Sequence, residues 1–129
     1  DQLLDYEAGA LSADACRVGN FKIVRRIFEG RDQENVRHLA LRIISAAGHI
    51  AVFGISDSEK GRLILACAKD VPGDMASVLR ETCRKFGGGG GGQPRLAQGG
   101  GLDATRLEEA LGFAIERIRA AIPSRSLDA

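Results

Sequence analysis

The first part of the chain alternates between helical and strand-like spacing of its apolar residues. Apolar residues recur at helical spacing over residues 2–18, which predicts a helix there. Residues 21–28, with the sequence FKIVRRIF, are rich in β-branched and aromatic side chains and predict a strand. Asp32 then stands at the N-cap position of a second helix, whose apolar positions continue to Ala47 and which Gly48 ends.

The second part of the chain contains two more strand-like runs and two more helices. Residues 49–56 and 62–69 are apolar runs joined by a polar segment, and they predict a hairpin with a longer loop or two neighbouring strands. Asp74 caps the next predicted helix, and Asp103 caps the last one, which Pro123 ends. The helix after Asp74 has one apolar stripe, formed by Met75, Val78, Leu79, Thr82, Cys83 and Phe86.

The predicted order is helix, strand, helix, strand, strand, helix, glycine-rich segment and helix. Strands interleaved with amphipathic helices predict an α/β fold class, as a two-layer domain with a small mixed sheet covered by helices. We expect an N-terminal helical arm over 1–18 that stands outside this core, a globular domain over 19–123 and a flexible tail over 124–129.

The composition agrees with one globular domain and limits how it can bind a ligand. The 129 residues are 44% apolar and 27% charged, as in ordinary globular proteins. Aromatic residues make up 5% and Trp is absent, so base stacking on exposed rings is not expected to dominate binding. The net charge is +1, but residues 60–106 hold eight Lys and Arg against four Asp and Glu, so this half is locally basic.

The cysteines and the lack of targeting patterns predict a cytoplasmic protein. Cys16, Cys67 and Cys83 are odd in number and far apart, which indicates reduced thiols instead of a disulfide framework. The sequence has no apolar run of about 18 residues and no signal-peptide pattern, so we expect no membrane partner. Because it starts at Asp1 without Met, we expect it to be a piece of a longer protein.

The segment 87–101 is the most unusual part of the sequence. Six glycines are followed by Gln-Pro-Arg-Leu-Ala-Gln and by three more glycines. A flexible linker is one interpretation of such a run. Three features argue against it: the segment contains no Ser or Thr, it joins two capped helices, and it includes Pro94 and Leu96, which are not typical of linkers.

A glycine-rich loop at this place also has a direct binding role. Without Cβ atoms, consecutive N–H groups can face one concavity and another backbone can approach closely. Arg84 and Lys85 precede the loop, so its surface suits phosphate and ribose. No Gly-Lys-Ser/Thr follows, which excludes a Walker-type ATPase, and the loop follows a helix instead of a strand, unlike a dinucleotide-binding fingerprint.

The string GGGGGGQPRLAQGGG, together with the helix that contains Cys83, resembles the signature of the C-terminal (C-Ala, DHH-associated) domain of alanyl-tRNA synthetases. The likeness extends upstream through the strand at 21–28 and covers essentially the whole chain. It implies a tRNA-binding module without chemistry of its own, which contacts the outer corner of tRNA and links aminoacylation with editing. The implied partners are alanine-specific tRNA, other domains of the same synthetase and, through the N-terminal helix, a second copy.

By this resemblance, the motif glycines and Gln98 carry the tRNA-binding surface. Arg84, Lys85 and Arg95 join them here because their charges flank the glycines. The predicted tRNA-binding residues are Arg84, Lys85, Gly87, Gly88, Gly89, Gly90, Gly91, Gly92, Arg95, Gln98, Gly99, Gly100 and Gly101.

No catalytic residue, metal site or cofactor is predicted for the chain. His38 and His49 are eleven residues apart on different predicted elements and have no neighbouring Cys, unlike the ligands of a tetrahedral zinc site. Cys83 is expected to be a core residue of its helix.

Two alternatives stay open. One is the C-terminal nucleic-acid-binding domain of a DHH-family phosphodiesterase or a free-standing alanyl-tRNA editing hydrolase. The phosphodiesterase form typically has a His after shorter glycines, whereas position 93 is Gln here. The other alternative is an oligomerisation module driven by the apolar stripe of the N-terminal helix, which consists of Leu4, Leu11, Ala15 and Val18. It leaves the glycine segment unexplained.

The missing ligand sets generate a first prediction. The purified chain is expected neither to activate alanine, nor to deacylate mischarged tRNA, nor to retain zinc, because no zinc-ligand or nucleophile pattern is found. Elemental analysis and a deacylation assay check this. Stoichiometric zinc, or deacylation above the rate in buffer, would contradict it.

Overall fold

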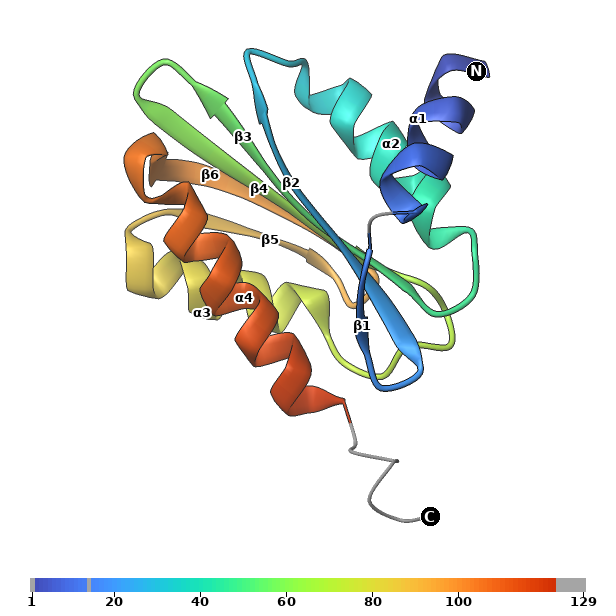
Figure 1. The fold of residues 1–129 in the computed structure, drawn as a ribbon. Helices are drawn as coiled ribbons and strands as arrows, with labels where there is room; N and C mark the ends of the chain where they lie inside the picture. Colours follow the sequence, from blue (N-terminus) through green and yellow to red (C-terminus); the bar gives the residue numbers. More distant parts are fainter. Residues whose placement is uncertain (1, 14, 123–129) are drawn as a thin grey trace.

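A computed structural model describes residues 2–13 and 15–122 as a mixed six-stranded sheet with helices (Figure 1). The strand order is β1-β2-β3-β4-β6-β5, and only β2 and β3 are parallel. In chain order the elements are α1 (Gln2–Ala13), β1 (Cys16–Val18), β2 (Phe21–Glu29), α2 (Gln33–Ile44), β3 (His49–Asp57), β4 (Lys60–Cys67), α3 (Met75–Phe86), β5 (Gly89–Gln93), β6 (Leu96–Asp103), a 3-10 turn (Ala104–Arg106) and α4 (Leu107–Ala121).

Helices cover both faces of the sheet. Side chains alternate along a strand, so the apolar run of β3 supplies both faces at once. Ile50 and Val52 pack in the cluster with α3 and α4, whereas Ala51 and Phe53 pack in the cluster with α1 and α2. The α/β class with a small mixed sheet is confirmed. The sheet is, however, the middle of three layers and not one of two, because both faces of its central strands are apolar.

The helix boundaries follow their capping residues. The Asp32 carboxylate accepts a hydrogen bond from the N–H of Asn35 at the start of α2, and Asp74 accepts from two N–H groups at the start of α3. Gly87 ends α3 in the left-handed conformation, with φ +83°. Asp103 caps the 3-10 turn that leads into α4. The predicted stop at Pro123 and the predicted tail over 124–129 lie outside the described residues.

The helix predicted over 2–18 is too long. It ends at Ala13, and Cys16–Val18 forms β1, which pairs antiparallel with the start of β2. The reason is a tight turn at 19–20, where Gly19 has φ +63° and lets the chain fold back on itself. The division into an arm, a globular domain and a tail stays a prediction.

The first helix lies against α2 (Figure 1). Ala8 and Leu11 are buried in the cluster that includes α2. The guanidinium of Arg31 donates two hydrogen bonds of 2.6 Å to the carboxylate of Glu7, which lowers the pKa of Glu7. Leu11, which belongs to the stripe proposed for oligomerisation, therefore already packs against other residues of the same chain.

The glycine segment is a β-hairpin and not a loop. Residues 89–93 form β5, which pairs antiparallel with β6, and β6 pairs with β4. Ala97 and Leu102 anchor β6 because both are buried in the core shared with α3. The flexible-linker interpretation is wrong, because these glycines form the edge strand of the sheet.

Close approach of the two hairpin strands depends on missing side chains. A Cβ added at Gly90 would lie 2.5 Å from the carbonyl oxygen of Gln98, closer than real Cβ contacts allow. Cβ atoms added at Gly88, Gly92 and Gly99 would meet backbone atoms across the hairpin in the same way. A Cβ added at Gly91 would meet no atom within 4 Å. Gly90 and Gly91 are neighbours in β5, but the opposite strand excludes a side chain at Gly90 and leaves space for one at Gly91.

This difference generates a second prediction. Gly90→Ala is expected to lower the free energy of unfolding by about 1–3 kcal/mol, because backbone must move to admit the methyl group. Gly91→Ala is expected to be neutral or to stabilise by up to about 1 kcal/mol, because it reduces the entropy of the unfolded chain. Urea unfolding of both variants measures the two effects. Equal stabilities would contradict the strand pairing described here.

Candidate nucleic-acid interface

The two faces of the glycine hairpin differ in what covers them. One face packs on α3, where a Cβ added at Gly99 would lie 3.3 Å from the Sγ of Cys83. The opposite face belongs to the side of the sheet that α2 covers. In an antiparallel pair, directly opposite residues point to the same face, so Gly91 shares this face with Gln98, and Gly89 shares it with Gly100. We call Gly89, Gly91, Gly100 and Gln98 the glycine surface.

The glycine surface is open and nearly free of side chains. A Cβ added at Gly89 would meet no atom within 4 Å, as at Gly91. The side-chain amide of Gln98 accepts a hydrogen bond of 3.3 Å from the amide of Gln33, at the start of α2. This bond links the hairpin to the helix beside it. The result is a strip of partly exposed backbone that a partner chain can approach closely at Gly89 and Gly91.

Arg62 of β4 lies at one end of the glycine surface. A Cβ added at Gly100 would lie 3.4 Å from the Cγ of Arg62, so the stem of this side chain crosses the glycine. Among the described residues, the Arg62 guanidinium has no ion pair or hydrogen bond. Sequence reasoning missed Arg62. The signal in the sequence was that Arg62 is a charged residue at the start of the apolar run 62–69. Such a residue ordinarily indicates only where a strand begins.

A β-bulge positions Arg62 beside Gly100. Gly61 pairs with Leu102, but Leu63 pairs with Gly99. Arg62 therefore lies opposite two residues of β6, Gly100 and Gly101. The second of these, Gly101, has φ +82°. A glycine with positive φ at a bulge bends the strand locally and redirects nearby side chains. Gly101 therefore has a structural role in shaping the interface.

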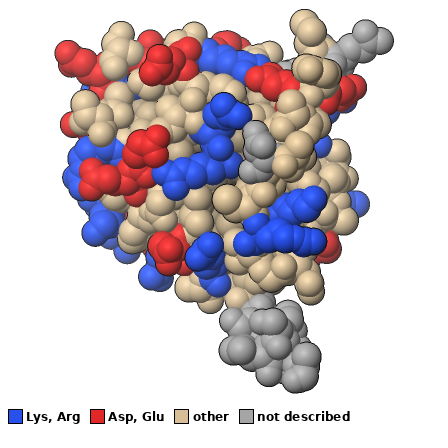
Figure 2. Space-filling view, viewed as in Figure 1, with Lys and Arg blue, Asp and Glu red and all other residues tan. Residues whose placement is uncertain are grey.

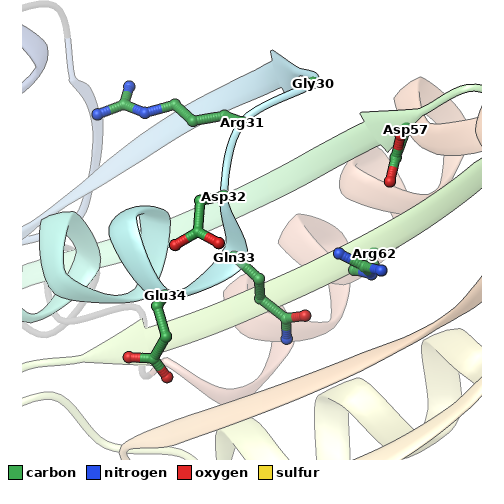
Figure 3. A pocket seen from close by; sticks show the side chains of 7 residues that line it. All are labelled: Gly30, Arg31, Asp32, Gln33, Glu34, Asp57 and Arg62. Carbon is green, nitrogen blue, oxygen red and sulfur yellow. The ribbon is translucent and has the colours of Figure 1, made fainter.

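Two hollows adjoin the glycine surface. The first has a volume of about 620 Å³ and lies at the carboxyl ends of the parallel strands β2 and β3 (Figure 3). Its lining residues are Gly30, Arg31, Asp32, Gln33, Glu34, Asp57 and Arg62. The second has about 300 Å³ and lies between the end of α2 and the hairpin turn. Its lining residues are Leu41, Ile44, Ser45, Cys67, Ala68, Lys69, Gln93, Arg95 and Leu96.

The structure separates the three cations that the sequence placed together. Arg95 lies at the hairpin turn, where its carbonyl accepts from the N–H of Cys67 and its side chain lines the second hollow with Lys69. Arg84 and Lys85 lie on α3, beneath the opposite face of the sheet. The ammonium of Lys85 is 5.5 Å from the ring centroid of Phe113 on α4. The two residues on α3 are thus apart from the glycine surface.

Charges on the face that carries α4 are mixed. Figure 2 shows basic and acidic side chains interspersed over this face. Ion pairs cross it, between Arg25 and Glu108 at 2.7 Å and between Arg117 and Glu81 at 3.1 Å. Arg62, Lys69 and Arg95 have no ion pair within the described part of the chain, and the same holds for Arg84 on α3. An arginine without an ion pair among the described residues therefore lies at each end of the glycine surface.

The remaining chemistry-bearing residues have structural surroundings. Burial raises the pKa of the thiols of Cys67 and Cys83, so both are less reactive than a free thiol. His38 is exposed, and its Nε2 lies 3.6 Å from a carboxylate oxygen of Glu34. Within 2–13 and 15–122, His, Cys, Asp and Glu side chains form no group of three or more that could hold a metal ion. No described helix is long and apolar enough to span a membrane.

Comparison with known proteins places the chain in a family. Residues 19–120 match the model of the DHHA1 domain. An alanine–tRNA ligase from Nostoc sp. is 34% identical over 119 residues, which are 86% of this chain and 13% of the ligase. The alanine–tRNA ligase of Nostoc punctiforme is 32% identical over 129 residues, covering 94% of this chain and 14% of the ligase. The chain thus spans about one seventh of the length of these relatives.

Solved structures agree with the sequence matches. The C-Ala domain of Aquifex aeolicus alanyl-tRNA synthetase superimposes with a TM-score of 0.69 at 25% identity, covering 84% of this chain and 96% of that domain. RecJ from Thermus thermophilus shares the fold, with a TM-score of 0.65 at 16% identity over 95% of this chain and 18% of RecJ. The resemblance drawn from the glycine motif is confirmed, and the chain belongs to the DHHA1 domain family.

Proposed function

We propose that this domain binds tRNA through the glycine surface, as an appended module of an alanine–tRNA ligase. The observation that carries the proposal is a strip of partly exposed glycine backbone with an arginine at each end, Arg62 and Arg95, that has no ion pair within the described residues. The similarity to alanine–tRNA ligases and to a C-Ala domain supports tRNA as the nucleic acid.

The geometry favours contacts with the RNA backbone over base stacking. β5, which carries part of the strip, has five residues and is about 17 Å long at ~3.4 Å per residue. Bare glycines allow ribose and phosphate to approach the protein backbone closely. Arg62, Lys69 and Arg95 are placed to neutralise phosphates at its two ends. Among the described residues, no aromatic side chain lines either adjoining hollow, so we expect affinity to depend on salt more than on base sequence.

We also propose a finer role, which the similarity to alanine–tRNA ligases supports. In this proposal the domain contacts the outer corner of alanine-specific tRNA, works with other domains of the same synthetase in the cytoplasm, and links aminoacylation with editing without chemistry of its own. A second copy would bind through the outer face of α1, where Tyr6 is 79% exposed. The ligase relatives, at up to 34% identity, favour this role over a phosphodiesterase domain such as that of RecJ at 16%.

The separation of the cations generates a third prediction. Arg62→Ala and Arg95→Ala are each expected to weaken tRNA binding similarly for different tRNA sequences. Each is also expected to lower the slope of log affinity against log salt by roughly 0.7–0.9, because one phosphate contact is lost. Titrations of tRNA at several salt concentrations measure the slope.

Arg84→Ala is the matched control, since Arg84 is an exposed arginine on the opposite side of the sheet. We expect this variant to keep the affinity and the slope of the wild type. A reduced slope in Arg84→Ala, with unchanged slopes in the other two variants, would instead place RNA on the α3 side, as the sequence alone predicted.

The open face generates a fourth prediction. Gly91→Ala, which leaves the fold intact, is expected to weaken tRNA binding because its methyl group intrudes on the RNA backbone. The glutamate variant Gly91→Glu is expected to weaken it by about tenfold or more, since it adds charge repulsion. Gly112→Ala on α4 is the control, as its Cβ would also meet no atom within 4 Å. Wild-type affinity in both Gly91 variants would contradict the proposed interface.

A further inference from the structure

The first hollow contains two opposite charges that do not pair with each other. Asp57 stands at the carboxyl end of β3 and Arg62 near the start of β4, on strands that are hydrogen-bonded neighbours. Figure 3 shows both side chains facing the hollow beside Gln33. Within the described residues, neither the Asp57 carboxylate nor the Arg62 guanidinium has an ion pair or a hydrogen bond.

The other charged residues of this hollow are already engaged. Arg31 points away from it, toward α1 (Figure 3), and donates to Glu7 at 2.6 Å. Asp32 caps α2. Glu34 pairs with Arg37 at 3.2 Å. Asp57 and Arg62 are therefore the two charged groups of the hollow that are available to a ligand.

A carboxylate beside a phosphate-binding surface needs an explanation. It repels phosphate and can only accept hydrogen bonds, so its favourable partner is a donor that lies close to a phosphate. The ribose 2′-hydroxyl is such a donor, and it distinguishes RNA from DNA. Carboxylates accept from ribose hydroxyls in the same way in dinucleotide-binding proteins.

We propose that this hollow selects RNA over DNA. Arg62 holds a phosphate at the end of the glycine surface, and Asp57 accepts a hydrogen bond from the 2′-hydroxyl of the adjoining nucleotide. A deoxyribose leaves the Asp57 carboxylate near phosphate without a donor, which disfavours DNA. This inference rests on the proposed function, because it requires nucleic acid on the glycine surface.

The experiment compares a tRNA transcript with a DNA copy of the same sequence, using the chain and its variants. Wild type is expected to bind the RNA about tenfold more tightly than the DNA. Asp57→Ala is expected to bring this ratio to within about twofold, because it removes the acceptor and the repulsion together. Arg62→Ala is expected to weaken both affinities and keep the ratio, since the phosphate is common to RNA and DNA.

Glu59→Ala is the matched control, because it removes an equal charge from the same β3–β4 hairpin at a residue that does not line this hollow. It is expected to keep the RNA-to-DNA ratio of the wild type. Equal affinity of wild type for RNA and DNA, or an unchanged ratio in Asp57→Ala, would overturn the selection by Asp57.

Failure of the proposed function has a different signature. The wild type would then bind neither nucleic acid, or its RNA affinity would be unaffected by Gly91→Glu. A ratio that follows base identity instead of the sugar would also overturn this inference, because Asp57 would then accept from a base amino group. In that outcome the glycine surface would still bind RNA.

Discussion

The glycine surface depends on one constraint, the close backbone approach between β5 and β6. At Gly90 the space for a Cβ is already filled by the carbonyl oxygen of Gln98, at 2.5 Å. A side chain there would force the strands apart. Ala97 and Leu102 anchor β6 in the core that contains the residues of α3. One face of the hairpin therefore packs against α3, and no described helix packs on its other face at Gly89 and Gly91. Every feature of the glycine surface follows from that arrangement.

Much of the fold could be predicted from local patterns. The caps at Asp32 and Asp74 and the apolar runs of β3 and β4 appear where the sequence predicts them. Prediction failed where tertiary pairing overrides local preference. Glycine is depleted in strands, yet residues 89–93 form one because β6 supplies their hydrogen bonds. Residues 16–18 likewise become a strand only through the turn that starts at Gly19.

Which residues bind tRNA stays a prediction, but the structure divides the predicted residues in a way that the sequence did not indicate. The sequence treats the motif glycines as one group, whereas the structure separates those that face backbone, such as Gly90, from those that face open space, such as Gly91. This alternation follows from the period of two in a strand, which a loop interpretation cannot provide. For a similar reason, the arginine beside the glycines is Arg62 and not Arg84. Closeness in sequence suggested Arg84, whereas strand pairing brings Arg62 to the glycines.

The glycine backbone can contact the phosphates of any nucleic acid, so selection between RNA and DNA must come from side chains at the edge of the glycine surface. Phosphate contacts give affinity without discrimination, because RNA and DNA share the phosphate. Within the described residues, the hollow at one end of the surface holds a cation and an anion, Arg62 and Asp57, that form no ion pair with each other. An anion at that place weakens phosphate binding unless the partner brings a donor to it. In the selection that we propose, a surface built of glycine gains specificity through a residue that lowers its general affinity.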